Sequence, residues 1–292
     1  MRNYLTEERL LLLKKEYSKM PEGSLNIKSH KGYYSFYHYN NSQQVTISRN
    51  QNLIYRLARK KYLSFVINNR PTADIQVLLD KFLKSGLDLQ RITLTPAQYR
   101  WVKSDYPKNT GWQENLKYVT DSGVNMRSKS ERDIGNELEH YAVPYRYDML
   151  YYVDVSAVID GLRDYLTKHK YWRYNNRTLY TYRDGYCVWN VPEELQWMNA
   201  PGSIWRSYDY RNNTITVSVD FSIMLGDGSI LLWEHAGLCL NPIYRCNISE
   251  RIFVLQTSNY VPSSNILFTT ENEILDLTDI DRLIEEKIIP RL

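Results

Sequence analysis

The feature that most constrains the fold is an alternating apolar stretch followed by a glycine turn. Apolar residues occupy every second position from residue 215 to 223, namely Ile215, Val217, Val219, Phe221 and Ile223. Polar residues fill the positions between them, which is the pattern of a strand with one buried face. Gly226-Asp227-Gly228 then precedes a second apolar run, ILLWEHAG. We therefore expect an antiparallel hairpin over residues 214–236.

Two registers of this hairpin are open. If residues 226–228 form a three-residue loop, Leu225 pairs with Ser229 and Asp220 lies opposite Glu234. If Asp227-Gly228 is a two-residue loop, Glu234 turns to the other face. Glycines at both ends of the loop tolerate a bulged turn, so we favour the first register.

Three acidic residues stand out by position. Glu131 opens an expected helix, Asp220 interrupts the apolar strand, and Glu234 lies near the end of the partner strand. Carboxylates brought together from two strands and a helix form an oxygen-rich pocket that suits Mg²⁺ or Mn²⁺. The same residues also have purely structural explanations: Ser128 and Glu131 fit a helix capping box, Asp220 fits a solvated sheet face, and Glu234 fits a polar strand end.

The remaining pattern predicts a mixed α/β (α+β) fold. We expect helices near residues 6–20, 52–67, 72–85, 95–104, 129–141, 247–260 and 278–288. Short strands are expected at residues 24–29, 33–39, 44–48, 145–153 and 265–270. This divides the chain into a basic helix/β-meander module (1–70), a helical connector (71–125) and an α/β core (126–292).

The first segment is strongly basic. Residues 1–70 hold 13 Lys and Arg against four Glu, a charge of +9, which leaves 24 basic and 29 acidic residues, or −5, for residues 71–292. Such asymmetry favours a polyanionic partner, although a merely solvated basic face explains it equally well. The candidate phosphate contacts are Lys28, Lys31, Arg59, Lys60, Lys61 and, near the acids, Lys129.

Several strings carry a family resemblance. They are RSKSERDIGNELEHYAVPYRYD, then VDFSIM, then WEHAGL, followed by a helix with Tyr244 and Arg251. In this order they resemble the PD-(D/E)XK nuclease superfamily, and most of all a group of bacterial nuclease-like proteins with R-S-K-S-E, Y-R-Y-E, P-D-F and W-E-H motifs. The resemblance covers about residues 1–153 and 214–292. It implies a restriction-endonuclease-like core in which Glu131, Asp220 and Glu234 hold the metal.

The sequence departs from the family pattern in two places. Val219 replaces the proline of the P-D pair, and Ala236 replaces the lysine that normally stabilises negative charge near the metal. Two residues are candidates to replace that lysine: Arg251, as a charge-stabilising group, and His235, as a base or ligand. The resemblance thus implies metal binding more firmly than it implies cleavage.

Residues 155–213 have no counterpart in the family pattern and are expected to be an insertion. Aromatic and basic residues interleave there between Lys168 and Trp189. This pattern suits stacking on unpaired bases, and it suits equally a small β-rich unit with its own core.

We therefore expect a cytoplasmic, Mg²⁺- or Mn²⁺-dependent endonuclease that hydrolyses DNA, with RNA as an alternative partner. The alternative is a catalytically silent nuclease-fold protein that binds nucleic acid or a protein partner. A homodimer is the other association that the sequence leaves open. No apolar run is long enough for a membrane span, and three scattered cysteines form neither a disulfide framework nor a zinc site.

Overall fold

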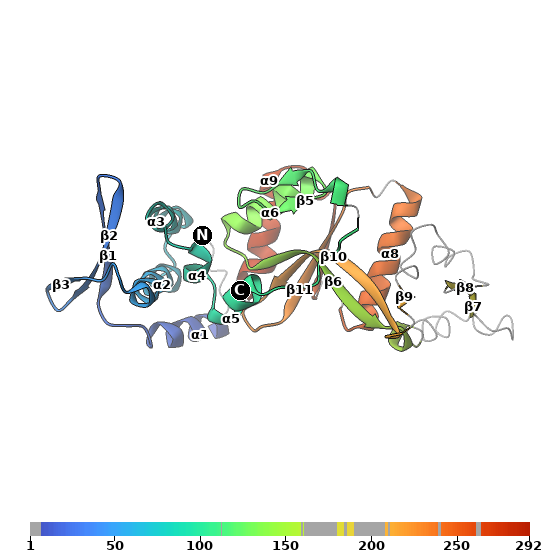
Figure 1. The fold of residues 1–292 in the computed structure, drawn as a ribbon, viewed down its shortest axis with the longest axis horizontal. Coiled ribbons are helices and arrows are strands. Elements are labelled where there is room, and N and C mark those ends of the chain that lie inside the picture. Colours follow the sequence, from blue (N-terminus) through green and yellow to red (C-terminus); the bar gives the residue numbers. More distant parts are fainter. Residues whose placement is uncertain are drawn as a thin grey trace.

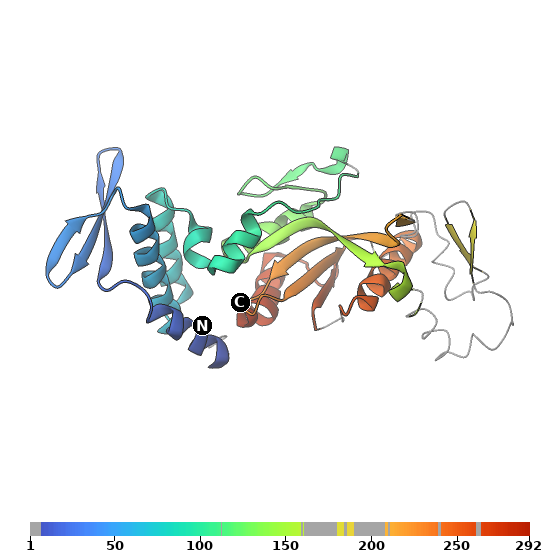
Figure 2. The same cartoon turned by 60° about the horizontal axis from the view of Figure 1, so that its bottom comes forward.

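The structure, a computed structural model, has a mixed α+β architecture. It describes residues 7–111, 113–158, 160, 180–183, 186–189, 208–209, 211–238, 241–260 and 264–292. Figures 1 and 2 show a three-stranded sheet at one end, a group of helices beside it, and a larger sheet beyond them. This agrees with the fold class expected from the sequence.

The N-terminal module contains the elements expected from the sequence and one more short helix. The order is α1 (Glu7–Tyr17), β1 (Ser24–His30), β2 (Tyr33–Asn40), β3 (Gln43–Thr46), α2 (Gln51–Ile67), α3 (Thr72–Lys84) and α4 (Leu89–Thr93). Leu25, Ile27 and Phe36 on one face of the sheet share a buried cluster with α2, α3 and α4. That cluster reaches Ile92, so the core of the module extends past the expected boundary at residue 70.

The connector attaches the module to the larger sheet. Its helix α5 (Pro96–Lys103) begins with a capping box formed by Thr95 and Gln98, and the Gln98 amide also donates to the carbonyl of Met224, at 3.1 Å. The guanidinium of Arg146 donates to the carbonyl of Trp101 and lies 4.4 Å from the centre of its ring. Because Arg146 is buried in the sheet, these contacts fix α5 against it.

The core contains a mixed sheet in the order β12-β11-β10-β6. Its strands are β6 (Tyr145–Asp154), β10 (Thr214–Met224), β11 (Ile230–Ala236) and β12 (Ile266–Thr270); β12 runs parallel to β11, and the other two pairs are antiparallel. Short strands lie outside this order: β4 (Tyr118–Val119) pairs with β5 (Asn125–Met126), β7 (Tyr180–Arg183) with β8 (Tyr186–Trp189), and β9 (Tyr208–Asp209) with β10.

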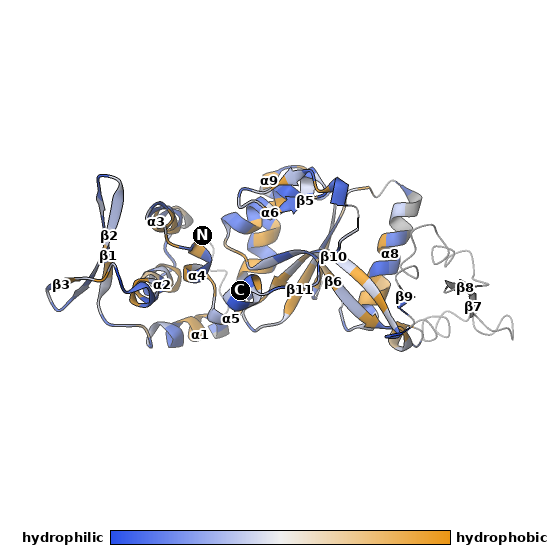
Figure 3. Ribbon diagram, viewed as in Figure 1, coloured by the Kyte–Doolittle hydropathy of each residue, from blue (hydrophilic) through white to orange (hydrophobic). Residues whose placement is uncertain are grey.

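Helices α6 (Lys129–His140) and α9 (Leu277–Leu283) cover one face of this sheet. A π-helical turn (Ile284–Ile288) continues α9, and a 3₁₀ turn (Ile289–Arg291) ends the chain; another 3₁₀ turn, Gln113–Asn115, precedes β4. Ile134, Leu138, Phe221 and Trp233 are fully buried between helices and sheet. Figure 3 shows the hydrophobic residues along β10 and β11 that supply this core.

The favoured register of the hairpin is confirmed. Phe221 pairs with Trp233 and Met224 with Ile230, and the Leu225 amide donates to the carbonyl of Ser229 at 2.8 Å. The loop is therefore Gly226-Asp227-Gly228, and continuation of the same register puts Asp220 opposite Glu234.

Helix α8 (Pro242–Thr257) begins five residues earlier than the sequence pattern predicts and lies against β10.

Most of the expected insertion at 155–213, including the bulk of its aromatic and basic stretch, lies outside the described residues. Among the helices that the structure describes, none combines the length and apolar character that crossing a membrane requires.

Candidate functional site

The candidate site lies where β10 and β11 separate. Their ladder ends at Phe221 and Trp233, after which β10 continues beside β6 and β11 continues beside β12. Side chains replace the missing ladder bonds. The amide of His235 donates to Asp220 Oδ2 at 2.8 Å, and the amide of Asp220 lies 3.4 Å from Glu234 Oε2. Both carboxylates therefore lie in the fork between the two strands.

A third carboxylate, Asp148, approaches the fork from β6. The β6–β10 ladder pairs Tyr147 with Phe221 and Met149 with Val219, but is interrupted where Asp148 would face Asp220. Asp148 has a left-handed backbone with φ of 56°, a conformation that Asp tolerates better than most residues. Its side chain is buried and forms an ion pair with Arg127.

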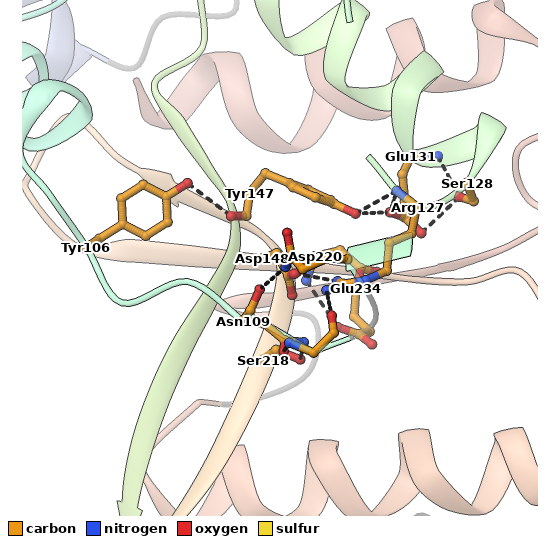
Figure 4. A network of polar contacts seen from close by, with 12 residues as sticks. Tyr106, Asn109, Arg127, Ser128, Glu131, Tyr147, Asp148, Ser218, Asp220 and Glu234 are labelled. Carbon is orange, nitrogen blue, oxygen red and sulfur yellow. Dashed lines mark hydrogen bonds and ion pairs between the residues drawn. The ribbon is translucent and has the colours of Figure 1, made fainter. Parts of the chain in front are cut away.

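Glu131 lies above these residues at the first turn of α6. Ser128 caps the helix by accepting the amide of Glu131 at 3.1 Å, and its hydroxyl also lies 2.9 Å from Glu131 Oε1. The hydroxyl of Tyr147 donates to Glu131 Oε2. Figure 4 shows Asp148, Asp220 and Glu234 gathered together, with Glu131 and Tyr147 next to them. The expected capping role of Ser128 and the approach of Glu131 to the other acids are thus both present.

Arg251 reaches the fork from α8. Its guanidinium forms an ion pair with Glu234 Oε1 and lies 3.4 Å from the carbonyl of Ser218. Burial lowers the pKa of Arg251, but Glu234 and Asp220 more than offset this, so that the net shift is upward. Arg251 is therefore a fixed positive charge beside the carboxylates, on the element where the sequence predicts it.

The carboxylates outnumber the cations that pair with them. Glu131, Asp148, Asp220 and Glu234 have a formal charge of −4 when ionised, whereas the ion pairs of Arg127 and Arg251 supply +2. Asp220 has no ion pair of its own within the described part of the chain. Burial and the neighbouring Glu234 and Glu131 raise its pKa well above the usual range. The excess of two negative charges equals the charge of one divalent cation.

The donor set fits Mg²⁺ or Mn²⁺, because it consists of carboxylate oxygens. As the side chains lie, however, no three acidic, His or Cys side chains converge on one point in the parts of the chain that the structure describes. Glu131, Asp148 and Glu234 are each turned toward a donor of the protein itself: Tyr147, Arg127 and Arg251. A metal ion would have to compete with these partners for the oxygens.

The expected role of His235 as base or ligand is not supported by its position. Its side chain is buried, with Nδ1 3.1 Å from Thr269 Oγ1 and Nε2 3.2 Å from Glu271 Oε1. Both ring nitrogens are therefore engaged outside the fork, and the contact with Asp220 is made by the backbone amide. Neighbouring residues on a strand point to opposite faces, which is why His235 and Glu234 separate.

Two of the expected phosphate contacts have internal roles instead. Arg59 is buried, where it pairs with Glu16 and donates to the carbonyl of Ile92 at 2.8 Å. The ammonium of Lys60 donates to the carbonyls of Pro21 and Gly23 at 2.7 and 3.1 Å. A buried and paired guanidinium is not available to a phosphate, so the structure does not support Arg59 in this role, and the ammonium of Lys60 is already occupied by backbone.

The other candidate lysines remain open to a ligand. Lys28, Lys31 and Lys129 are exposed, and Lys61 is partly buried. Burial and nearby Lys81 lower the pKa of Lys61. Lys129 lies at the start of α6, two residues before Glu131.

Sequence reasoning missed Asp148, Arg127 and Tyr147. The signal was present, because the string Tyr145-Arg146-Tyr147-Asp148 matches the family motif Y-R-Y-E, with Asp148 in place of the glutamate.

Comparison of the chain with protein-family models, with curated proteins and with solved structures found no match.

Proposed function

We propose that this chain is a metal-dependent nuclease of restriction-endonuclease-like fold, which hydrolyses phosphodiester bonds of DNA in the fork between β10 and β11. The observation that carries the proposal is the group of carboxylates at the fork, from Asp148, Asp220, Glu234 and Glu131, which when ionised carry two more negative charges than their arginine partners neutralise. The resemblance of the RSKSE, VDF and WEH strings to PD-(D/E)XK nucleases supports the same site.

In this proposal Asp220 and Glu234 hold the metal ion, together with Glu131. A bound Mg²⁺ or Mn²⁺ activates water and offsets charge on the phosphate. Asp220 is the residue most available to it, since its carboxylate accepts the backbone amide of His235 and is not paired with an arginine of its own in the described part of the chain. Tyr147 and Ser128 orient Glu131, and Arg127 holds Asp148 beside the pair.

Arg251 takes the place of the family's lysine, whose position is occupied by Ala236 in this chain. A guanidinium does not act as a base near neutral pH, but it stabilises negative charge on a phosphate oxygen and can do so while contacting Glu234. Arg251 is about a quarter exposed, which leaves part of the side chain accessible to a substrate. Its role is therefore charge stabilisation and not proton transfer.

Cleavage of linear, nicked, branched and single-stranded DNA in Mg²⁺ or Mn²⁺ tests the proposal. We expect cleavage by the wild type, none in EDTA, and a loss of at least a hundredfold in Asp220→Ala with DNA binding retained. A matched control is Asp227→Ala, which changes an acid in the hairpin loop of the same two strands. Undiminished cleavage by Asp220→Ala would exclude this site.

The second candidate is a silent nuclease scaffold that binds nucleic acid or a protein. It is favoured by Ala236 and by the pairing of Glu234 with Arg251, which occupies an oxygen that a metal would need. Titration calorimetry with Mn²⁺ separates the two. A nuclease binds Mn²⁺ through Asp220, whereas the scaffold binds DNA without cleaving it and without needing the metal.

A further inference from the structure

The outer face of the N-terminal sheet is an aromatic surface. Leu25, Ile27 and Phe36 point to the module core, so the residues that alternate with them point to the other side. The strand register assigns ten residues to this outer face: Ser24, Asn26, Lys28, His30, Tyr33, Ser35, Tyr37, Tyr39, Gln44 and Thr46. We call these residues the tyrosine face.

Two rings of the tyrosine face, Tyr33 and Tyr39, are open to solvent, Tyr37 is partly buried, and basic groups accompany them. Tyr33 is 61% exposed and Tyr39 46% exposed. The ring of His30 stacks on Tyr33 with centroids 4.9 Å apart, and the ammonium of Lys28 lies 4.9 Å from the centre of Tyr37. Exposed aromatic rings on a sheet are removed from water when a flat partner covers them, which favours binding of such a partner.

The charge of this surface favours a polyanion as its binding partner. None of the ten residues of the tyrosine face is acidic, and Lys31 in the β1–β2 turn adds a further exposed cation. Tyr37 and Tyr39 are two residues apart on one strand, so their rings are spaced by roughly 7 Å along it. A row of rings bordered by cations suits a strand of nucleic acid, whose unpaired bases stack on the rings while its phosphates meet the lysines.

We propose that the tyrosine face binds unpaired nucleotides of a nucleic-acid strand. The inference rests on the proposed nuclease function and deepens it, because it makes the substrate one with a single-stranded part. Paired bases in a duplex are stacked on one another and cannot stack on the rings. The tyrosine face therefore discriminates between single-stranded and fully paired substrates.

The test measures binding of labelled oligothymidylate and of a blunt duplex of equal length to the full chain in EDTA. Wild type is expected to bind the single strand at least tenfold more tightly than the duplex. Replacing Tyr33, Tyr37 and Tyr39 together by Leu should weaken single-strand binding by about tenfold for each ring that stacks. Replacing the same three residues by Phe keeps the rings and should preserve it.

Tyr34→Leu is the matched control, since Tyr34 lies on the same strand but on the other face. If the triple Leu variant does not fold, Tyr33→Leu alone serves, because Tyr33 is the most exposed of the three. Equal binding by the Leu and wild-type chains, or equal affinity for single strand and duplex, overturns the inference. Because the assay contains no metal, that result leaves the nuclease proposal intact if cleavage still depends on Asp220.

Discussion

A buried carboxylate with other carboxylates close to it makes the stability of a protein depend on pH and on bound cations. Asp220 is in this position, since burial and the charges of Glu234 and Glu131 raise its pKa. At neutral pH its ionised form therefore opposes folding unless a cation is present. Removing the charge should therefore stabilise the protein without metal and weaken its stabilisation by metal.

Asp220→Asn is therefore expected to raise the free energy of unfolding in EDTA by roughly 1 kcal/mol at neutral pH, because the amide removes the repulsion and can still accept from the His235 amide. In excess Mg²⁺ the order should reverse. Saturation at a hundred times Kd stabilises the wild type by about 2.7 kcal/mol, while the variant lacks one ligand. Thermal unfolding of both chains with and without Mg²⁺ measures this crossover; a variant stabilised equally by Mg²⁺ would contradict it.

The part of the site predicted from the sequence is the part encoded by local pattern. Asp220 interrupts an apolar alternation, and Glu234 follows from the length of a glycine loop, so their juxtaposition depends on one hairpin. Asp148 could not be placed in the same way, because β6 pairs with β10 across about 60 intervening residues. Its left-handed backbone, which interrupts the ladder, has no sequence pattern of its own.

At the scale of elements, α6 and α9 meet through an acidic contact. Burial raises the pKa of Glu137 on α6 to about 7, with a hydrogen bond to Asp281 on α9 and the charge of Asp281 adding to the effect. Between its ordinary value of 4.5 and about 7, the folded protein thus holds a proton that the unfolded chain has released. This contribution to stability is complete below about pH 4.5 and disappears as the pH rises through 7.

The difference in melting temperature between wild type and Glu137→Gln should therefore change across this window. The variant, which cannot ionise, should become relatively more stable as the pH rises from 4.5 to 7, and the difference should be constant above that. Glu286→Gln, an exposed position in the π-helical turn that follows α9, is the control and should show no such trend. A parallel pH dependence of wild type and Glu137→Gln would show that the contact does not titrate.

Elements with a clear periodicity were predicted well, and elements defined by long-range contacts were not. The meander, α2, α6 and the hairpin follow from spacing of apolar residues and turn signals. Helix α4, with five residues, is too short to show a period. The parallel pairing of β12 with β11 joins strands separated by α8, and no local signal specifies which edge β12 takes.

At the scale of the whole molecule, the basic residues among the first 70 fall into two groups: some bind other parts of the protein, and others face solvent. Arg59 and Lys60 are bound to the protein itself, whereas Lys28 and Lys31 face solvent next to the tyrosine face. The charge count alone could not separate these two groups, because it does not say which side of α2 or β1 a residue occupies.

Replacing Lys28 and Lys31 by Gln should therefore reduce the slope of log affinity against log salt by about 1.4 for single-stranded DNA, at roughly 0.7 for each phosphate that is no longer neutralised. The double variant Lys117→Gln with Lys287→Gln removes the same charge from exposed positions outside the N-terminal module and controls for net charge. Binding titrations between low and moderate salt give the slopes. Superimposable slopes for the wild type and the module variant would mean that these lysines bind no phosphate.

Ion binding in the fork between β10 and β11 should also change the hydrogen exchange of two backbone amides. The amide protons of Asp220 and His235 are held by carboxylate oxygens and not by the neighbouring strand, so their protection from deuterium depends on where those carboxylates point. An ion that draws the oxygens of Asp220 and Glu234 toward itself should speed isotope exchange at these two amides, while the amides of Phe221 and Trp233, in the intact ladder, stay protected. Occupancy of the fork can thus be followed through two backbone protons, with no substrate present.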